Sequence, residues 1–171
     1  ILDQGYWPDG LLTAPTDEAL KRDIELTMRM GYNGARKHQK FEDPRYLYWA
    51  DCMGLLVWEE LPSPYRFTDA MKRNCYRDMA DAIKRDYNHP CIITWVPMNE
   101  SWGIYQVKSH PEQQMFTDSL YYMIHALDKT RIVSSNDGWE NPQTDIVTVH
   151  DYASFTRDLS PEYKSTEGIL T

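Results

Sequence analysis

Short apolar runs alternate with amphipathic helical patterns along the chain, and this alternation constrains the fold more than any other feature. The runs occupy residues 1–3, 32–38, 55–60, 91–96, 131–135 and 145–149. Between most of them, apolar residues recur at every third or fourth position, which is typical of helices that bury one face. Alternating strands and helices predict an α/β protein with a parallel sheet.

Capping residues predict where the helices begin and end. Thr16 precedes the first helical pattern, and Gly31 follows it. Asp43 stands before Pro44 at the start of the second pattern, and Gly54 follows its end. Two further helices are predicted over residues 68–87 and 112–127.

Polar side chains follow the strands, which distinguishes between two parallel architectures. A doubly wound nucleotide-binding sheet has a glycine-rich turn after its first strand, and the chain contains neither GxGxxG nor GxxxxGK[ST]. A closed barrel instead presents its chemistry at the carboxyl ends of many strands. The strand-end residues are Asp3 and Gln4; Arg36 and His38; Glu59 and Glu60; Asn99, Glu100 and Trp102; Asn136, Asp137 and Trp139; and His150, Asp151 and Tyr152. This pattern predicts a (β/α)8 TIM-barrel type of α/β fold.

The barrel is expected to be incomplete. The six strand signals fall short of the eight that a closed barrel has. The chain also lacks an initiator Met, so we expect residues 1–171 to be a mature fragment or an excised piece, forming part of one catalytic barrel domain. A partial barrel exposes apolar strand edges and helix faces, which predicts a homo-oligomer formed through those edges.

Composition excludes several classes of partner. Lys and Arg number 18 against 26 Asp and Glu, a net charge of −8, and no basic run interrupts this balance, so neither nucleic acid nor an anionic membrane surface is expected to bind. No apolar stretch reaches the roughly 20 residues of a membrane span. Cys52, Cys75 and Cys91 lack the CxxC spacing of a zinc site and are expected to be packed free thiols. No cofactor or metal is predicted, and neither Mg²⁺ nor Na⁺ is indicated.

Two segments together resemble a known family. GYNGARKHQKFEDPRYLYWADCMGLLVWEELP (31–62) and NHPCIITWVPMNES (88–101) resemble the catalytic barrel of glycoside hydrolase family 2, which includes β-galactosidases, β-glucuronidases and β-mannosidases. In that family an Arg ends the second strand, an acidic residue ends the third, and a hydrophobic run followed by Asn-Glu ends the fourth. The resemblance extends from about residue 2 to 152 and implies a retaining, β-galactosidase-like glycosidase acting on a small-molecule or oligosaccharide substrate.

The resemblance assigns Glu100 as general acid/base and Asn99 as a donor to a sugar hydroxyl. Glycoside cleavage requires protonation of a poor leaving group, which a carboxyl group of raised pKa can perform near neutral pH. Trp95 and Trp102 are expected to supply apolar surroundings that raise the pKa of Glu100.

A retaining mechanism also requires a nucleophilic carboxylate about 5–5.5 Å from the acid/base. In the family this residue ends the seventh strand, after an apolar run. The one superficial match here is Glu167 in STEG, and the polar segment SPEYK before it is unlike a strand. The nucleophile is therefore expected beyond Thr171.

The remaining predicted substrate-binding residues fall where the family lines its sugar subsite: Arg36, His38, Glu60 with Glu59 as its alternative, Trp102, Asp137, Trp139, His150 and Asp151. Arg36 has two open roles, direct sugar contact or a structural pair with Glu60. A tryptophan at a strand end could stack on a pyranose or act as an aromatic lid packed on its own loop.

Two other functions compete. A metal-dependent barrel hydrolase could use His38, Glu60, Glu100, His150 and Asp151 as ligands, although the HxH and HExxH spacings are absent. A non-catalytic sugar-binding module would keep the aromatic pocket without the nucleophile.

Overall fold

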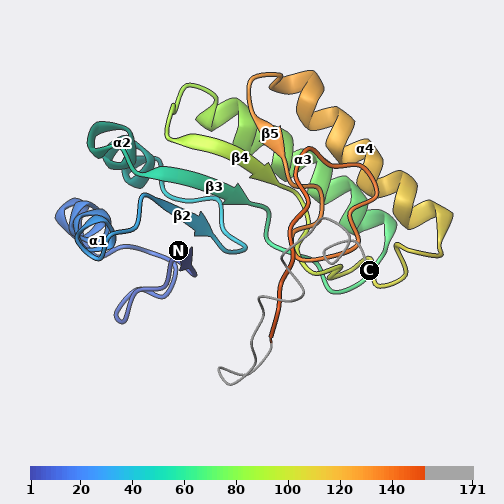
Figure 1. Cartoon of the computed structure of the whole chain (residues 1–171), viewed down its shortest axis with the longest axis horizontal. Helices are drawn as coiled ribbons and strands as arrows, with labels where there is room; N and C mark the ends of the chain where they lie inside the picture. The colour runs from blue at the N-terminus through green and yellow to red at the C-terminus, as the bar shows by residue number, and fades with distance from the viewer. Residues whose placement is uncertain (153–171) are drawn as a thin grey trace, which may run out of the picture.

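The computed structural model describes residues 1–152, and within them strand and helix alternate from Leu2 to Val133 (Figure 1). The strands are β1 (Leu2–Asp3), β2 (Gly34–Lys37), β3 (Leu56–Glu60), β4 (Ile92–Val96) and β5 (Ile132–Val133). The helices are α1 (Asp17–Arg29), α2 (Pro44–Met53), α3 (Asp69–Asp86) and α4 (Pro111–Leu127). Over the described residues, no helix has the length and apolar character needed to cross a membrane.

The five strands form one parallel sheet whose spatial order follows the order of the chain. Along the β2–β3 pair, Gly34 lies opposite Leu56 and Lys37 lies opposite Glu59. A doubly wound sheet reverses its strand order at a switch point, whereas a barrel adds each strand beside the previous one. The sheet therefore corresponds to consecutive strands of a β/α barrel, which confirms the predicted fold class.

The caps that the sequence predicts at Thr16, Asp43 and Gly54 are present, and Thr68, at the start of the predicted segment 68–87, caps a third helix. Thr16, Asp43 and Thr68 are the N-caps of α1, α2 and α3, and each side chain accepts a hydrogen bond from a backbone N–H of the first turn. Gly54 ends α2 with φ of 82°, a left-handed conformation that glycine adopts without steric cost. These local signals fix the lengths of the helices and hence the points at which the strands begin.

The core lies between one face of the sheet and the helices that cover it (Figure 1). Its buried apolar side chains come from all four helices and from the strands: Leu20, Ile24, Leu47, Ala50, Val57, Met79, Ile83, Trp95, Leu120, Ile124 and Val133. Each larger one contributes about 1.5–3 kcal/mol on burial. This layer gives the strands a rigid support on their helix-facing side.

The other face of the sheet is open within residues 1–152. Leu2, Leu56, Ile93 and Ile132 are 51%, 39%, 36% and 42% exposed. Leu2, Leu56 and Ile93 line a hollow of about 440 Å³ together with Trp58. Inward-facing residues of a closed barrel pack in layers against the opposite wall. The described residues thus form one side of a barrel wall, and self-association through this face or the sheet edges stays a prediction.

The prediction of a sixth strand at residues 145–149 is wrong. Residues 145–149 form no strand, and Val147 and Val149 are 56% and 45% exposed. The Asp145 carboxylate accepts the Val133 N–H at 2.8 Å, so a side chain occupies a place in the hydrogen-bond ladder that a sixth strand would fill with backbone. Because β5 has only two residues, it offers a neighbour little backbone to pair with. The described sheet has five strands where the sequence predicts six.

A buried lysine joins the first two strands on the side opposite to the barrel interior. Lys37 is 1% exposed, and its Nζ lies 2.6 Å from Asp3 Oδ2 and 2.7 Å from Glu42 Oε2. Its ammonium also lies 4.3 Å from the centre of the Tyr46 ring. Burial opposes the charge, but the two carboxylates more than compensate and raise the pKa of Lys37. The cation therefore holds β1 and the loop before α2 on β2.

Replacing Lys37 with methionine is expected to lower the free energy of unfolding by about 3–5 kcal/mol, because two acidic side chains then lose their buried counter-ion. Urea denaturation measures the change. Lys72→Met is the matched control, since Lys72 pairs with the exposed Asp69 on the surface of α3 and its replacement should change stability far less. Equal effects of the two substitutions would contradict the structural role of Lys37.

Candidate active site

The guanidinium of Arg36 joins the carboxyl ends of four neighbouring strands. Its Nε lies 2.8 Å from Glu60 Oε2 and 2.7 Å from Asp137 Oδ2. Its Nη2 donates to Asn99 Oδ1 at 2.6 Å. Glu60, Asn99 and Asp137 are each at most 2% exposed, so one guanidinium pairs with two buried acids. The sequence left two roles open for Arg36, and the structure contains one of them, the ion pair with Glu60.

Strand geometry decides between the two adjacent glutamates that end β3. Successive side chains of a strand point to opposite faces, so only one of the pair can face the barrel interior. Glu60 meets Arg36 there, and burial raises its pKa to about 7 although the guanidinium acts in the opposite direction. Glu59 points into the helix layer, where its carboxylate accepts the backbone N–H of Glu42 at 3.0 Å. Glu60 therefore belongs to the cluster at the strand ends, and Glu59 does not.

Two histidines border this cluster. His38 Nε2 lies 3.4 Å from Asn99 Nδ2, and burial together with the nearby Arg36 lowers the pKa of His38. His150 Nδ1 lies 2.6 Å from Glu100 Oε1, and its Nε2 lies 3.2 Å from Asp137 Oδ2. Arg36 Nη1 is 3.3 Å from the same Nε2. A ring protonated at Nδ1 donates to Glu100 and accepts from Arg36, whereas a doubly protonated ring donates to both carboxylates.

Glu100 follows β4 and carries a carboxylate with several donors around it. Both His150 and the Tyr152 hydroxyl bond to its Oε1. Burial raises the pKa of Glu100, but hydrogen bonds from Tyr152, His150 and Trp102 outweigh burial and hold the pKa below its usual value. The sequence-based expectation of a raised pKa therefore differs from this structure. Trp95 also lies elsewhere, fully buried in the core with its indole N–H donating to Asp128.

The backbone at Glu100 adopts an unusual conformation. Glu100 and Ser101 have φ values of 49° and 57°, in the left-handed region that residues other than glycine seldom enter. The Glu100 N–H donates to the Asp137 carbonyl at 2.8 Å. Asn136, which is 0% exposed, accepts the Ser101 N–H at 2.9 Å and donates to Ser101 Oγ at 3.0 Å. The end of β5 therefore imposes the turn that orients Glu100.

Sequence reasoning placed Asn136 after the fifth strand without giving it a role. The only sequence feature that points to Asn136 is its position just before Asp137 at the end of a strand. A side-chain amide that hydrogen-bonds to a neighbouring loop leaves no recognisable motif in the sequence. The amide also donates to the carbonyls of Trp139 and Glu140. Asn136 thus orients both loops that flank the candidate acid/base.

A pocket of about 240 Å³ opens between these groups. It is lined by Leu2, Arg36, His38, Glu100, His150, Asp151 and Tyr152. Asn99 lies beneath, while Trp139 stands beside the pocket, with its ring centre 6.1 Å from that of His150 and 6.4 Å from that of Tyr152. Each of the ten predicted site residues lies at this edge of the sheet, and Tyr152 joins them as a lining residue. Glu167 lies outside the described residues.

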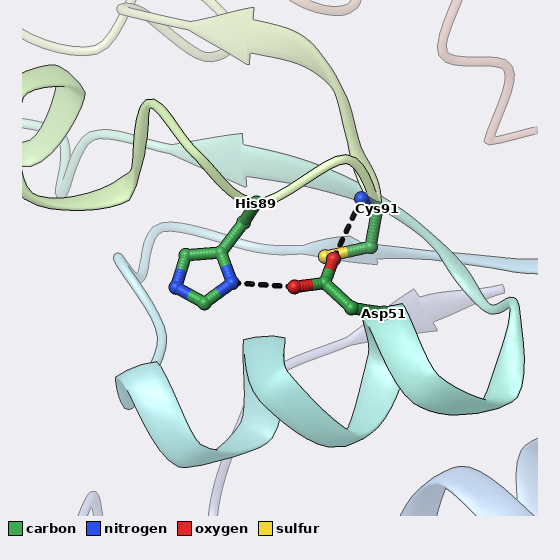
Figure 2. A group of neighbouring side chains, drawn as sticks. All are labelled: Asp51, His89 and Cys91. Atoms are coloured by element: carbon green, nitrogen blue, oxygen red, sulfur yellow. Dashed lines mark hydrogen bonds and ion pairs between the residues drawn. The ribbon is translucent and has the colours of Figure 1, made fainter.

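A different cluster of potential metal ligands lies at the opposite edge of the sheet. Figure 2 shows Asp51 on α2 facing His89 and Cys91, which precede β4. His89 Nδ1 lies 2.7 Å from Asp51 Oδ2, and the Cys91 N–H donates to Asp51 Oδ1 at 2.8 Å. Within residues 1–152, this is the one group of three such side chains close enough to share an ion. The five candidate ligands of a metal-dependent hydrolase, named from the sequence, contain no group of three that is close enough to share an ion in this part of the chain.

The contacts of this cluster favour a structural link over a metal site. Both carboxylate oxygens of Asp51 already accept hydrogen bonds, and burial raises the pKa of the Cys91 thiol, which opposes the thiolate form that binds metals. The thiol donates to the Leu47 carbonyl at 3.5 Å. The cluster therefore ties α2 to the start of β4, on the far side of the sheet from Glu100. Cys75 and Cys91 are buried free thiols, as predicted, whereas the third free thiol, Cys52, is exposed.

Comparison with known proteins shows extensive similarity. Residues 13–166 match the family model of the TIM barrel domain of glycosyl hydrolases family 2. A β-glucuronidase of Rattus norvegicus is 27% identical over 150 residues, covering 81% of this chain, and a β-galactosidase of Thermoanaerobacter pseudethanolicus is 30% identical over 121 residues, covering 69%. The crystal structure of a β-glucuronidase of Parabacteroides merdae superposes with a TM-score of 0.82 at 25% identity over 98% of the chain.

The chain is much shorter than the proteins that it matches. It spans 22% and 15% of the lengths of the two curated relatives, and 22% of the crystallised β-glucuronidase chain. The similarity therefore concerns the barrel wall and its strand ends.

Replacing Asn136 with alanine is expected to release the turn at Glu100. The loss of buried hydrogen bonds should lower the free energy of unfolding by about 1–3 kcal/mol and speed amide exchange at Ser101, whose N–H loses its acceptor. Hydrogen exchange followed by NMR measures this, with the Val57 amide of β3 as an internal reference. Asn74→Ala, at an exposed position of α3, is the control variant. Unchanged protection of Ser101 would contradict the assigned role.

Replacing Glu59 with glutamine is expected to flatten the pH dependence of stability. Burial raises the pKa of Glu59 to about 8, above the 4.5 of an unperturbed glutamate, so the folded state binds this proton more tightly than the unfolded state. Stability from this group is present below about pH 4.5 and is lost as the pH rises towards about 8. Urea midpoints at pH 5, 6.5 and 8 measure the trend, and the exposed Glu18→Gln is the control. If the stability of Glu59→Gln still fell steeply between pH 5 and 8, another group would be responsible for the pH dependence.

Proposed function

The chain belongs to glycosyl hydrolase family 2, and we propose that residues 1–171 form part of a catalytic barrel that hydrolyses β-glycosidic bonds with retention of configuration. The observation that carries the proposal is the Glu100 carboxylate, which follows β4, adjoins Asn99 and faces the pocket lined by Arg36, His38 and His150. The family match supports the reaction class. Both β-glucuronidases and β-galactosidases occur among the relatives.

Glu100 is the general acid/base in this proposal. In the first step its carboxyl proton passes to the glycosidic oxygen as the bond to the leaving group breaks. In the second step the carboxylate takes a proton from water, which attacks the anomeric carbon and releases the sugar from the nucleophile. The strained turn held by Asn136 supports this role, because it fixes one orientation of the carboxyl group for both steps.

The two steps need Glu100 first as an acid and then as a base, and a change in the charge of the nucleophile shifts its pKa accordingly. The hydrogen bonds from Tyr152 and His150 favour the carboxylate, which is the form needed in the second step. A negatively charged nucleophile about 5–5.5 Å away disfavours that charge and raises the pKa before the first step. Formation of the glycosyl bond removes the nucleophile's charge, so the pKa of Glu100 falls as its role changes from acid to base.

The nucleophile comes from outside residues 1–152. Among the described acids beside Glu100, Glu60 and Asp137 are both bound to the Arg36 guanidinium, which lowers their nucleophilicity. These two acids and Arg36 are better suited to position the floor of the sugar subsite. Asn99 lies beneath the pocket and is assigned as a donor to a sugar hydroxyl, while His38, His150 and Asp151 line the sugar. Trp139 stands beside His150, and Trp102 adjoins Glu100 outside the pocket lining.

The test is hydrolysis of a panel of aryl β-glycosides, including the β-galactoside and the β-glucuronide, by the gene-encoded protein that contains this chain. Glu100→Gln is expected to lower kcat/KM by at least about 100-fold on the preferred glycoside, and ¹H NMR should show the β-anomer as first product. Glu112→Gln, at an exposed position of α4, is the control. Full activity of Glu100→Gln would remove Glu100 from the mechanism, and saccharide binding without turnover would favour the non-catalytic module.

A further inference from the structure

Three exposed aromatic rings lie side by side beyond the ends of β3 and β4. The ring centres of Tyr65 and Trp102 are 5.5 Å apart, and those of Trp102 and Tyr105 are 5.8 Å apart. Both pairs meet edge to face, with interplanar angles of 83° and 70°. Tyr65, Trp102 and Tyr105 are 73%, 36% and 55% exposed. Contiguous exposed aromatic surface of this kind marks binding sites more often than isolated exposed rings do.

The loops that carry the rings are held against each other. Gly103 has φ of 77°, and a Cβ at this position would lie 2.8 Å from Pro64 Cγ and 2.9 Å from the Pro64 carbonyl oxygen. Only glycine fits this approach, which brings the loop of Tyr65 against the loop of Trp102. Ile104 and Val107, at 0% and 1% exposure, anchor the second loop in the core. The three rings, which we call the aromatic platform, are therefore held in place before any ligand arrives.

Glu100 stands between the platform and the pocket. Trp102 follows Glu100 by two residues and contributes to lowering its pKa, whereas His150 and Tyr152, which bond to its carboxylate, both line the pocket. None of the three platform rings lines the pocket of about 240 Å³. A general acid lies beside the bond that breaks, so the two halves of the substrate occupy the two sides of Glu100.

We propose that the aromatic platform binds the leaving group of the substrate, and that this leaving group is a pyranose, so that the substrate is a β-linked oligosaccharide. The inference rests on the proposed glycosidase function. Aromatic rings offer flat apolar surface to the C–H face of a sugar, and the two tyrosine hydroxyls at the edges of the platform can bond to sugar hydroxyls. The pocket takes the sugar that is released from the nucleophile, and the platform takes the sugar that leaves first.

The experiment compares substrates with and without a second sugar in the gene-encoded protein. Tyr65→Ala and Tyr105→Ala are each expected to lower kcat/KM on a β-linked disaccharide by about three- to tenfold and to leave the methyl β-glycoside of the same sugar unchanged. Tyr65→Phe and Tyr105→Phe keep the rings and should retain most of the activity. Tyr122→Ala is the matched control, since Tyr122 is 60% exposed and pairs with Tyr121 on α4.

A binding measurement separates the platform from the catalytic proposal. In a Glu100→Gln background, calorimetry of the disaccharide should show the same three- to tenfold loss in affinity for each alanine variant. If the unmodified protein lacks turnover but binds the disaccharide in a tyrosine-dependent way, the proposed function fails and the platform stands. Equal losses on the methyl glycoside, losses only on aryl glycosides, or unchanged disaccharide binding would each overturn the inference.

Discussion

The candidate site depends on one partly buried guanidinium. Arg36 binds Glu60, Asn99 and Asp137, which belong to the ends of three different strands, so the carboxyl edge of the sheet closes around a single cation. Two buried carboxylates this close would repel each other without it, and removing one partner of a buried ion pair costs several kcal/mol. The position of Glu100 depends on this arrangement, because its backbone N–H donates a hydrogen bond to the carbonyl of Asp137.

Strand alternation divides the charges of the chain between two separate clusters. Arg36 faces the barrel interior, whereas the next residue, Lys37, faces the helices and pairs with Asp3 and Glu42. Glu60 and Glu59 are divided in the same way. One cluster holds the strands and helices together, and the other forms the floor of the pocket. A shift of one residue in strand register would exchange the two sets and destroy both.

Local sequence signals predicted most of the fold. The predicted caps at Thr16 and Asp43 located the first two helices, and apolar periodicity located the other two, because these features act within one or two turns of chain. The apolar run at 145–149 predicts a strand that does not form, since its pattern carries no information about whether a neighbouring strand has backbone to pair with. In this structure the Asp145 side chain takes that place beside β5.

The sequence by itself determined the order of the strands, the residues at their ends and the family to which the chain belongs, since all three follow from local patterns and short motifs. Only the tertiary structure decided that Glu60 rather than Glu59 meets Arg36, that Asn136 holds the turn at Glu100, and that Tyr152 and His150 lower the pKa of Glu100. Each of these facts joins residues from separate strand ends and loops. Hydrogen bonds and desolvation depend on distances that exist only after the strands are assembled side by side.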